Sequence, residues 1–248
     1  MKEISIEEIY LNELNGLNNW KDLSRNYKLT EDIIIEFKDK LNWYYVCEYQ
    51  KLSENFMNNF EKKLSWYCVC KYQKLSEQFI KKHLDKIYWD LICQYQELSE
   101  SFIEKYVIEI YWNEIGKYQK LSEKFIEKYI NKFNLNLICR HQKLSESFIE
   151  KYLDKIDWKL ISKHQKLSEQ FIKKHLDKVN WTNVCIYQEL SEDFIRDNLK
   201  KIRWNEISKH QKLSESFIEE FKNKLNMITI SIYQNLSDEF REKHCLFI

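Results

Sequence analysis

Residues 158–180 read WKLISKHQKLSEQFIKKHLDKVN, and near-copies of this 23-residue stretch follow one another along most of the chain. A fixed period of about 20–50 residues is the signature of a protein built from stacked structural repeats. Tryptophan occupies the first position of most copies, and Leu135 and Met227 hold it in two others. We therefore expect ten repeats, which start at residues 20, 43, 66, 89, 112, 135, 158, 181, 204 and 227.

The first part of each repeat has the pattern of a short amphipathic helix. Positions 1, 4, 5 and 8, which are Trp158, Ile161, Ser162 and Gln165 in the quoted copy, have the spacing of one helical face. The residue before position 1 is often one that caps helix N-termini: Asn42, Ser65, Asn134, Asp157 and Asn180. The pattern predicts a helix of about eight residues in each repeat.

A second helix is predicted after the Leu-Ser-Glu at positions 10 to 12. Position 11 is serine in every repeat except the first, which has Thr30, and both residue types cap helices. The acid at position 12 suits the positive end of the helix dipole. The predicted helix has about ten residues and buries positions 14, 15, 18, 19 and 22. In the quoted copy these are Phe171, Ile172, His175, Leu176 and Val179.

Neither helix reaches the roughly 12–15 residues at which an isolated helix becomes marginally stable. Each must cover its apolar face with the neighbouring repeat, so the sequence predicts an all-α fold, an α-solenoid of ten helix-turn-helix repeats over residues 20–248. Residues 1–19 contain a capping-box pattern, Ser5 to Glu8, and are expected to form an N-terminal capping half-repeat. A leucine-rich-repeat fold has a similar period, but no repeat contains its Leu-x-x-Leu-x-Leu strand.

The composition excludes several classes of protein. The 40 Lys and Arg residues balance 39 Asp and Glu, which does not indicate binding of nucleic acid or membranes by bulk charge. Two glycines and no proline argue against phosphate-binding loops and β-rich folds. No apolar run approaches the roughly 18 residues of a membrane span, and the N-terminus lacks a signal-peptide pattern. We expect a cytoplasmic protein.

The cysteines and histidines repeat at fixed positions, which favours structural roles. Five of the seven cysteines share position 5 with Ser and Gly, as expected where helices approach closely. Histidines share positions 7 and 18 with other aromatic residues. No nucleophile–histidine–acid set or metal-ligand spacing stands out, so we expect no catalytic, metal or cofactor site and no enzyme activity. An odd number of buried thiols fits a reducing compartment.

Glutamine occupies position 8 in nine of the ten repeats, with Tyr27 as the exception. We expect its side-chain amide to bond backbone groups in the turn of the next repeat, so that a ladder of amides sets the register. Recognition of a ligand's backbone is the alternative.

The last four residues, Cys245 to Ile248, match a C-terminal prenylation box. Cys245 and Ile248 fall at positions 19 and 22, which are predicted core positions, and no polybasic run precedes them. We interpret the match as structural and expect no membrane anchor.

The wording of the repeat, YQKLSE.FIEKY..K..W..IS, resembles tandem repeats in proteins of giant amoeba-infecting DNA viruses of the mimivirus kind. The resemblance covers about residues 20–248, and the chain shares the Lys-, Asn- and Ile-rich composition of such proteins. It implies a helical repeat protein in the cytoplasm of an infected host. It brings no functional residues to this sequence.

The sequence favours a non-enzymatic scaffold that binds another protein along the solenoid surface. Specificity would come from exposed positions that vary between repeats, namely 2, 3, 6, 13, 16 and 17. Because aromatic residues are enriched among binding hot spots, Tyr44, Tyr45 and Tyr67 are the candidate anchors. Tyr45 has a second interpretation as a partly buried residue, because position 3 is leucine in several other repeats.

The alternative function is binding of single-stranded RNA along basic residues of the first helix. Position 6 is basic in six repeats and would form a track for phosphates beside aromatic residues. These residues are Arg25, Lys71, Lys117, Arg140, Lys163 and Lys209. The acid at position 12 of every repeat argues against such a track, so a protein partner is preferred.

Overall fold

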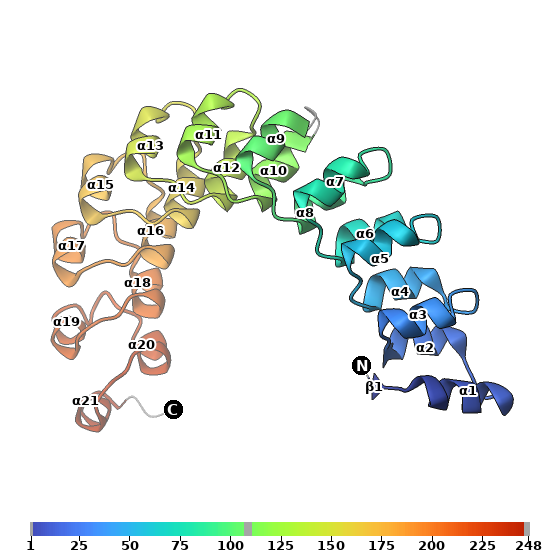
Figure 1. Cartoon of the computed structure of the whole chain (residues 1–248). Coiled ribbons are helices and arrows are strands. Elements are labelled where there is room, and N and C mark those ends of the chain that lie inside the picture. Colours follow the sequence, from blue (N-terminus) through green and yellow to red (C-terminus); the bar gives the residue numbers. More distant parts are fainter. Residues whose placement is uncertain (1, 107–110, 246–248) are drawn as a thin grey trace. The chain divides into compact units, whose positions relative to one another are not determined.

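A computed structural model describes residues 2–106 and 111–245 of the chain (Figure 1). They form two compact bodies, an N-terminal body Met1–Leu121 and a C-terminal body Ser122–Ile248. The described residues hold 21 helices and one pair of two-residue strands, and consecutive repeats are neighbours within each body. The predicted all-α solenoid is therefore confirmed.

Each repeat contributes one first helix and one second helix. The chain opens with β1(Lys2–Glu3) and α1(Ile6–Leu14), and β2(Tyr27–Lys28) follows the first helix of the first repeat. The first helices are α2(Trp20–Asn26), α4(Trp43–Tyr49), α6(Trp66–Tyr72), α8(Trp89–Tyr95), α10(Trp112–Tyr118), α12(Leu135–His141), α14(Trp158–His164), α16(Trp181–Tyr187), α18(Trp204–His210) and α20(Met227–Tyr233). The second helices are α3(Glu31–Glu36), α5(Glu54–Asn59), α7(Glu77–Lys82), α9(Glu100–Tyr106), α11(Glu123–Lys128), α13(Glu146–Lys151), α15(Glu169–Lys174), α17(Glu192–Asp197), α19(Glu215–Glu220) and α21(Asp238–Lys243).

The helices form two layers within each body. First helices pack against first helices of the next repeat, as α4 does against α6 and α14 against α16. Figure 1 shows the second helices as a separate row beside them. We call these layers the first-helix row and the second-helix row.

The predicted N-caps mostly form. The hydroxyl of Thr30 or of the serine at position 11 accepts the N–H of position 14 in every repeat, as Ser168 does from Phe171 at 3.1 Å. Asn180 caps the next first helix by accepting the Asn183 N–H at 3.0 Å. Ser65 lies at an N-cap but its side chain makes no capping bond, which differs from the prediction.

The second helix is shorter than the sequence suggests. It has six residues, or seven in α9, instead of about ten, and it ends at or just before position 18. A turn follows, in which the Lys178 N–H donates to the His175 carbonyl at 2.9 Å. Position 19 therefore lies outside the helix and outside the core. Leu176 is half-buried and Leu84 is exposed, whereas Val179 at position 22 is buried as predicted.

The small residue at position 5 has a hydrogen-bonding role as well as a packing role. Ser162 is fully buried, and its hydroxyl accepts the Asn180 N–H at 2.9 Å. The Cys70 thiol accepts the Tyr88 N–H at 3.4 Å in the same way. The side chain at position 5 therefore links its first helix to the residue just before the first helix of the next repeat. This hydrogen bond explains why position 5 is serine or cysteine in nine of the ten repeats.

The glutamine at position 8 forms the predicted ladder, but toward the preceding repeat and not the following one. Gln165 donates from Nε2 to the carbonyl oxygens of Cys139 (2.7 Å) and Gln142 (2.8 Å). Its Oε1 accepts the Leu144 N–H at 2.8 Å. The same three bonds recur at Gln50, Gln73, Gln96, Gln119, Gln188, Gln211 and Gln234.

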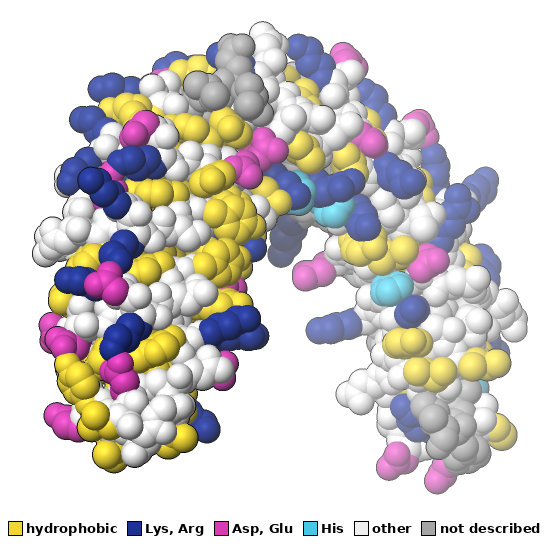
Figure 2. Space-filling view, turned by 90° about the vertical axis from the view of Figure 1, so that its right-hand side faces the viewer, with side chains coloured by type: hydrophobic (Ala, Val, Ile, Leu, Met, Phe, Trp, Pro, Cys, Tyr) yellow, Lys and Arg dark blue, Asp and Glu magenta, His cyan; other side chains and the backbone are white. Residues whose placement is uncertain are grey.

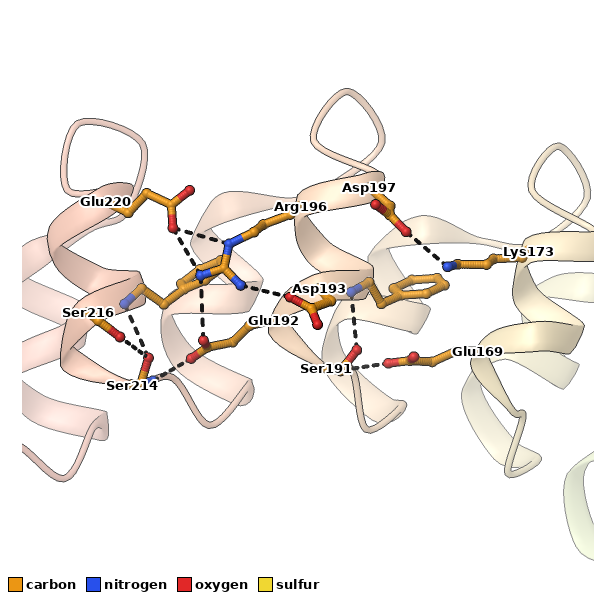
Figure 3. A network of polar contacts seen from close by, with 12 residues as sticks. Glu169, Lys173, Ser191, Glu192, Asp193, Arg196, Asp197, Ser214, Ser216 and Glu220 are labelled. Carbon is orange, nitrogen blue, oxygen red and sulfur yellow. Dashed lines mark hydrogen bonds and ion pairs between the residues drawn. The ribbon is translucent and has the colours of Figure 1, made fainter.

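A second ladder involves the acid at position 12. Glu169 accepts the backbone N–H of Ser191 in the next repeat at 2.5 Å, and Glu192 accepts that of Ser214 at 2.6 Å (Figure 3). The same bond joins six further pairs of repeats. The carboxylate thus bonds the N-cap residue of the next second helix, which sequence reasoning did not anticipate.

In the first and last repeats of this sequence, other groups lie at ladder positions that involve glutamine elsewhere. In the first repeat, β1 pairs in parallel with β2, with Lys2 opposite Tyr27, the residue that stands in the glutamine position. In the last repeat, the Arg241 guanidinium donates to the Ser231 carbonyl at 3.1 Å. Ser231 is at position 5. In other repeats, the position-5 carbonyl accepts a hydrogen bond from the glutamine of the following repeat. Arg241, at a position that is isoleucine in most repeats, thus bonds a carbonyl of the ladder.

Replacing Gln165 by leucine should lower the free energy of unfolding by about 3 kcal/mol, because three buried hydrogen bonds are lost and two carbonyls and one N–H are left unpaired. Urea denaturation followed by circular dichroism measures the change. The matched control is Gln170→Leu, an exposed glutamine of the same repeat. Equal stabilities of the two variants would contradict a stabilising ladder.

Deletion of residues 135–157 should leave a folded protein, because the ladder contacts join neighbouring repeats through positions that every repeat shares. The deletion places Trp158 directly after Asn134, which already caps a first helix. Helical content per residue, measured by circular dichroism, should stay unchanged and thermal unfolding should stay cooperative. Loss of the folded state would contradict the modular interpretation.

Candidate interaction surface

The first-helix row exposes positions 2, 6, 7 and 9 in most repeats, while positions 4, 5 and 8 are buried. Position 7 therefore corrects an expectation. His141, His164 and His210 were predicted to occupy a structural aromatic position, but all three are exposed, as are most tyrosines there. Figure 2 shows histidine side chains beside Lys and Arg side chains on the surface. The exposed side chains that differ most between repeats therefore lie on the first-helix row.

The predicted tyrosine anchors lie on the first-helix row of the N-terminal body. Tyr44 and Tyr67 are exposed, whereas Tyr45 is half-buried, in line with its second interpretation. The Tyr44 and Tyr45 rings meet edge to face with centroids 5.6 Å apart, and Tyr67 contacts Tyr88 in the same way at 5.9 Å. A hydrogen bond with the Cys68 thiol raises the pKa of Tyr44 to about 12.

The exposed aromatic surface is larger than the sequence suggested, because Tyr72, Tyr88 and Tyr95 belong to it. Together with Tyr44 and Tyr67 they are 41–48% exposed, and we call these five residues the tyrosine patch. Lys71 lies among them, with its Nζ 5.8, 5.0 and 5.8 Å from the ring centroids of Tyr67, Tyr72 and Tyr95. Hydrogen bonding to Tyr72 and the surrounding rings raise the Lys71 pKa, which keeps the ammonium charged.

The six predicted track cations all lie on the first-helix row, and several contact the aromatic residue at position 7 of the next repeat. Lys163 is 5.3 Å from the centroid of the Tyr187 ring, and Lys209 is 5.3 Å from that of Tyr233. Arg25 lies 5.8 Å from the Tyr49 centroid. Lys117 instead lies over Tyr118 of its own repeat. Alternating cations and rings therefore line this row in each body.

Shallow hollows recur between consecutive position-7 side chains. One of about 400 Å³ lies between Tyr187 and His210, and another of about 440 Å³ between His164 and Tyr187. The N-terminal body has equivalent hollows beside Tyr95. Glu189 lines both of the first two, and Glu97 lines both of the others. Their walls carry charges of both signs.

The second-helix row differs because its charges are paired between repeats. Lys173 contacts Asp197 at 2.9 Å, and Arg196 contacts Glu220 at 2.9 Å (Figure 3). His175 at position 18 is buried and contacts Glu150 at 2.8 Å, which fits its predicted structural role. These pairs hold neighbouring repeats together and neutralise much of this surface.

The cysteines are free thiols, and six of the seven are buried. Burial raises the pKa of Cys47 and Cys93 to about 12 and that of Cys70 and Cys139 to about 11. Cys245 is exposed, so its prediction as a core residue is wrong, and Ile248 lies outside the described residues. Cys245 is exposed because the second helix ends early and leaves position 19 at the surface.

Over residues 2–106 and 111–245, no group of three or more His, Cys, Asp or Glu side chains could hold a metal ion. No helix in the same ranges has the length and apolar character needed to cross a membrane. Comparison with known proteins finds no match to a protein family, to a curated protein or to a solved structure.

Only one thiol of the folded protein should react quickly with Ellman's reagent between pH 7 and 9. Thiolates react and thiols do not, and a pKa of about 12 keeps Cys47 and Cys93 protonated in this range. Cys245 should account for the fast reaction, and Cys245→Ser should abolish it. Unfolding in urea should release the remaining six. Fast reaction of the folded Cys245→Ser variant would contradict the burial of these thiols.

Proposed function

We propose that the protein is a non-enzymatic repeat scaffold that binds a segment of another protein through the tyrosine patch. The single observation that carries this proposal is the clustering of five exposed tyrosines along the first-helix row, where Tyr67 contacts Tyr88 and Lys71 lies near three of the rings. Soluble proteins rarely expose a large apolar surface without a use for it, and tyrosine is among the residues enriched in interface hot spots. Their hydroxyl groups also provide hydrogen bonds at the rim of such a contact.

A protein segment fits the hollows of the N-terminal body better than a strongly charged polymer does. The hollow between Tyr72 and Tyr95 is lined by Lys71, Lys74, Glu77 and Glu97, and the one between Tyr95 and Tyr118 by Glu97 and Lys120. Walls of mixed charge match the mixed side chains of a polypeptide. The repeated hollows suit an extended segment that crosses several repeats, and we place this binding in the cytoplasm, which would be the host cytoplasm for a viral chain. The free thiols are in keeping with a reducing compartment.

Tyr44→Ala/Tyr67→Ala/Tyr95→Ala should weaken binding of the protein partner by about 30-fold or more, because each hot-spot residue contributes at least about 2 kcal/mol. The partner is first captured from expressing cells with the unaltered chain and is then titrated in purified form by calorimetry. The control is Tyr187→Ala/Tyr233→Ala, which removes exposed tyrosines of the C-terminal body.

Both variants should keep the melting temperature of the parent chain within a few degrees, because the altered side chains are exposed. The control should bind the partner within about threefold of the parent. Equal affinity of the triple variant and the parent would overturn the assignment of the tyrosine patch. Equal losses in both variants would mean that the partner does not distinguish the patch from other tyrosines.

A further inference from the structure

The C-terminal body carries a basic patch on its first-helix row that the protein-binding proposal does not use. Two consecutive repeats place Arg140, Lys143, Lys163 and Lys166 on this row, all exposed. The exposed rings of His141 and His164 lie between them in sequence, at position 7 of the same repeats. We call these six residues the histidine–lysine patch.

The cations of this patch differ in their ion pairing from those on the second-helix row. Among the described residues, Arg140, Lys143, Lys163 and Lys166 form no ion pair, whereas Lys151 and Lys174 of the same repeats pair with Glu127 and Glu150. The positive potential of the patch also acts on His164. Partial burial lowers the pKa of His164, and the nearby charges of Lys163, Arg140 and His141 lower it further. The imidazole is therefore neutral near pH 7.

The acid at position 12, which weighed against a phosphate track in the sequence, is already engaged in the structure. Glu146 accepts the Ser168 N–H at 2.5 Å and Glu169 accepts the Ser191 N–H at 2.5 Å, each at the N-terminus of the next second helix. Both residues are half-buried. Their negative charge is therefore directed into the bonds between repeats. Glu189 is an exposed acid that lines the hollow beside Lys163 and Lys166, and the four cations of the patch outnumber it.

We infer that the histidine–lysine patch binds the backbone of single-stranded nucleic acid. Lysine and arginine at positions 6 and 9 would contact phosphates, and the planar rings at position 7 would stack with bases, with Tyr187 as the ring of the next repeat. Proteins that bind single strands combine a basic surface with aromatic stacking platforms in this way. An acidic peptide would satisfy the cations but would leave the successive exposed rings without a role.

The test is a fluorescence-anisotropy titration of the full chain with 12-nucleotide oligouridylate and oligodeoxythymidylate at about 50 and 200 mM salt. The neutralised variant is Arg140→Gln/Lys143→Gln/Lys163→Gln/Lys166→Gln. The matched control is Lys151→Gln/Lys155→Gln/Lys174→Gln/Lys178→Gln, which has the same net charge but changes other exposed lysines of the same two repeats. A third variant, His141→Ala/His164→Ala, removes the rings without removing a lysine.

The neutralised variant should bind at least about tenfold more weakly at low salt and should lose about three from the slope of log affinity against log salt, since each single-strand phosphate contact contributes about 0.7. His141→Ala/His164→Ala should lose roughly fivefold or more at both salt concentrations, because stacking is not screened. The control should bind like the parent chain.

Three results would overturn the inference. The first is no binding of either oligonucleotide at low salt, and the second is an equal loss in the neutralised variant and its control, which would indicate bulk charge. The third is binding of a polyglutamate peptide as tightly as the oligonucleotides, without effect of His141→Ala/His164→Ala, which would make the patch a site for acidic peptides. The inference is independent of the tyrosine patch, since none of these variants changes it.

Discussion

The buried glutamine at position 8 is the interaction that fixes how one repeat sits on the next. Apolar burial favours contact between the short helices but has no direction, so it alone would allow neighbouring repeats to slide. One planar amide that donates to two carbonyls and accepts from one N–H allows a single register. Because the amide is buried, any other register would leave polar groups unpaired. The rest of the stack depends on this choice.

Two other sets of bonds require the same register. The acid at position 12 reaches the serine N–H of the next repeat, and the serine or cysteine at position 5 reaches the backbone just before the next first helix. In the first repeat Tyr27 cannot supply an amide, and the paired strand β1 covers that edge instead. In the repeat that starts at Met227, Arg241 donates to the Ser231 carbonyl, which lies at the position that a glutamine bonds in the interior repeats. The first and last repeats of this sequence therefore use other groups at ladder positions.

The sequence predicted the period, the two helices of each repeat and most of the caps, since each depends on side-chain spacing within one repeat. It overestimated the second helix because positions 18 and 22 are buried in either conformation. His175 and Val179 keep an i to i+4 hydrogen bond across the turn that replaces the last helical turn. The direction of the glutamine bonds could not be inferred, because the repeats on either side have nearly the same sequence.

The candidate surface was predicted in part, for a related reason. Tyr44 and Tyr67 stand at a variable position, which pointed to the surface, and both are exposed. Tyr72 and Tyr95 were missed because an aromatic residue recurs at position 7, and recurrence suggested a structural role. Position 7 lies next to the buried stripe of the first helix but projects away from it. A residue type that recurs at one position of the repeat can therefore be either buried or exposed, and its recurrence alone does not show which.

The two rows of helices use their charged residues differently, and this difference limits where a partner can bind. On the second-helix row, pairs such as Arg196 with Glu220 join neighbouring repeats, so a partner would have to displace them. On the first-helix row the ladder lies beneath the surface, and positions 2, 6, 7 and 9 can change without disturbing it. Cations occur at these positions in both bodies, but position 7 holds histidine only in the C-terminal body, at His141, His164 and His210. One fixed set of buried bonds therefore supports two surfaces of different chemistry.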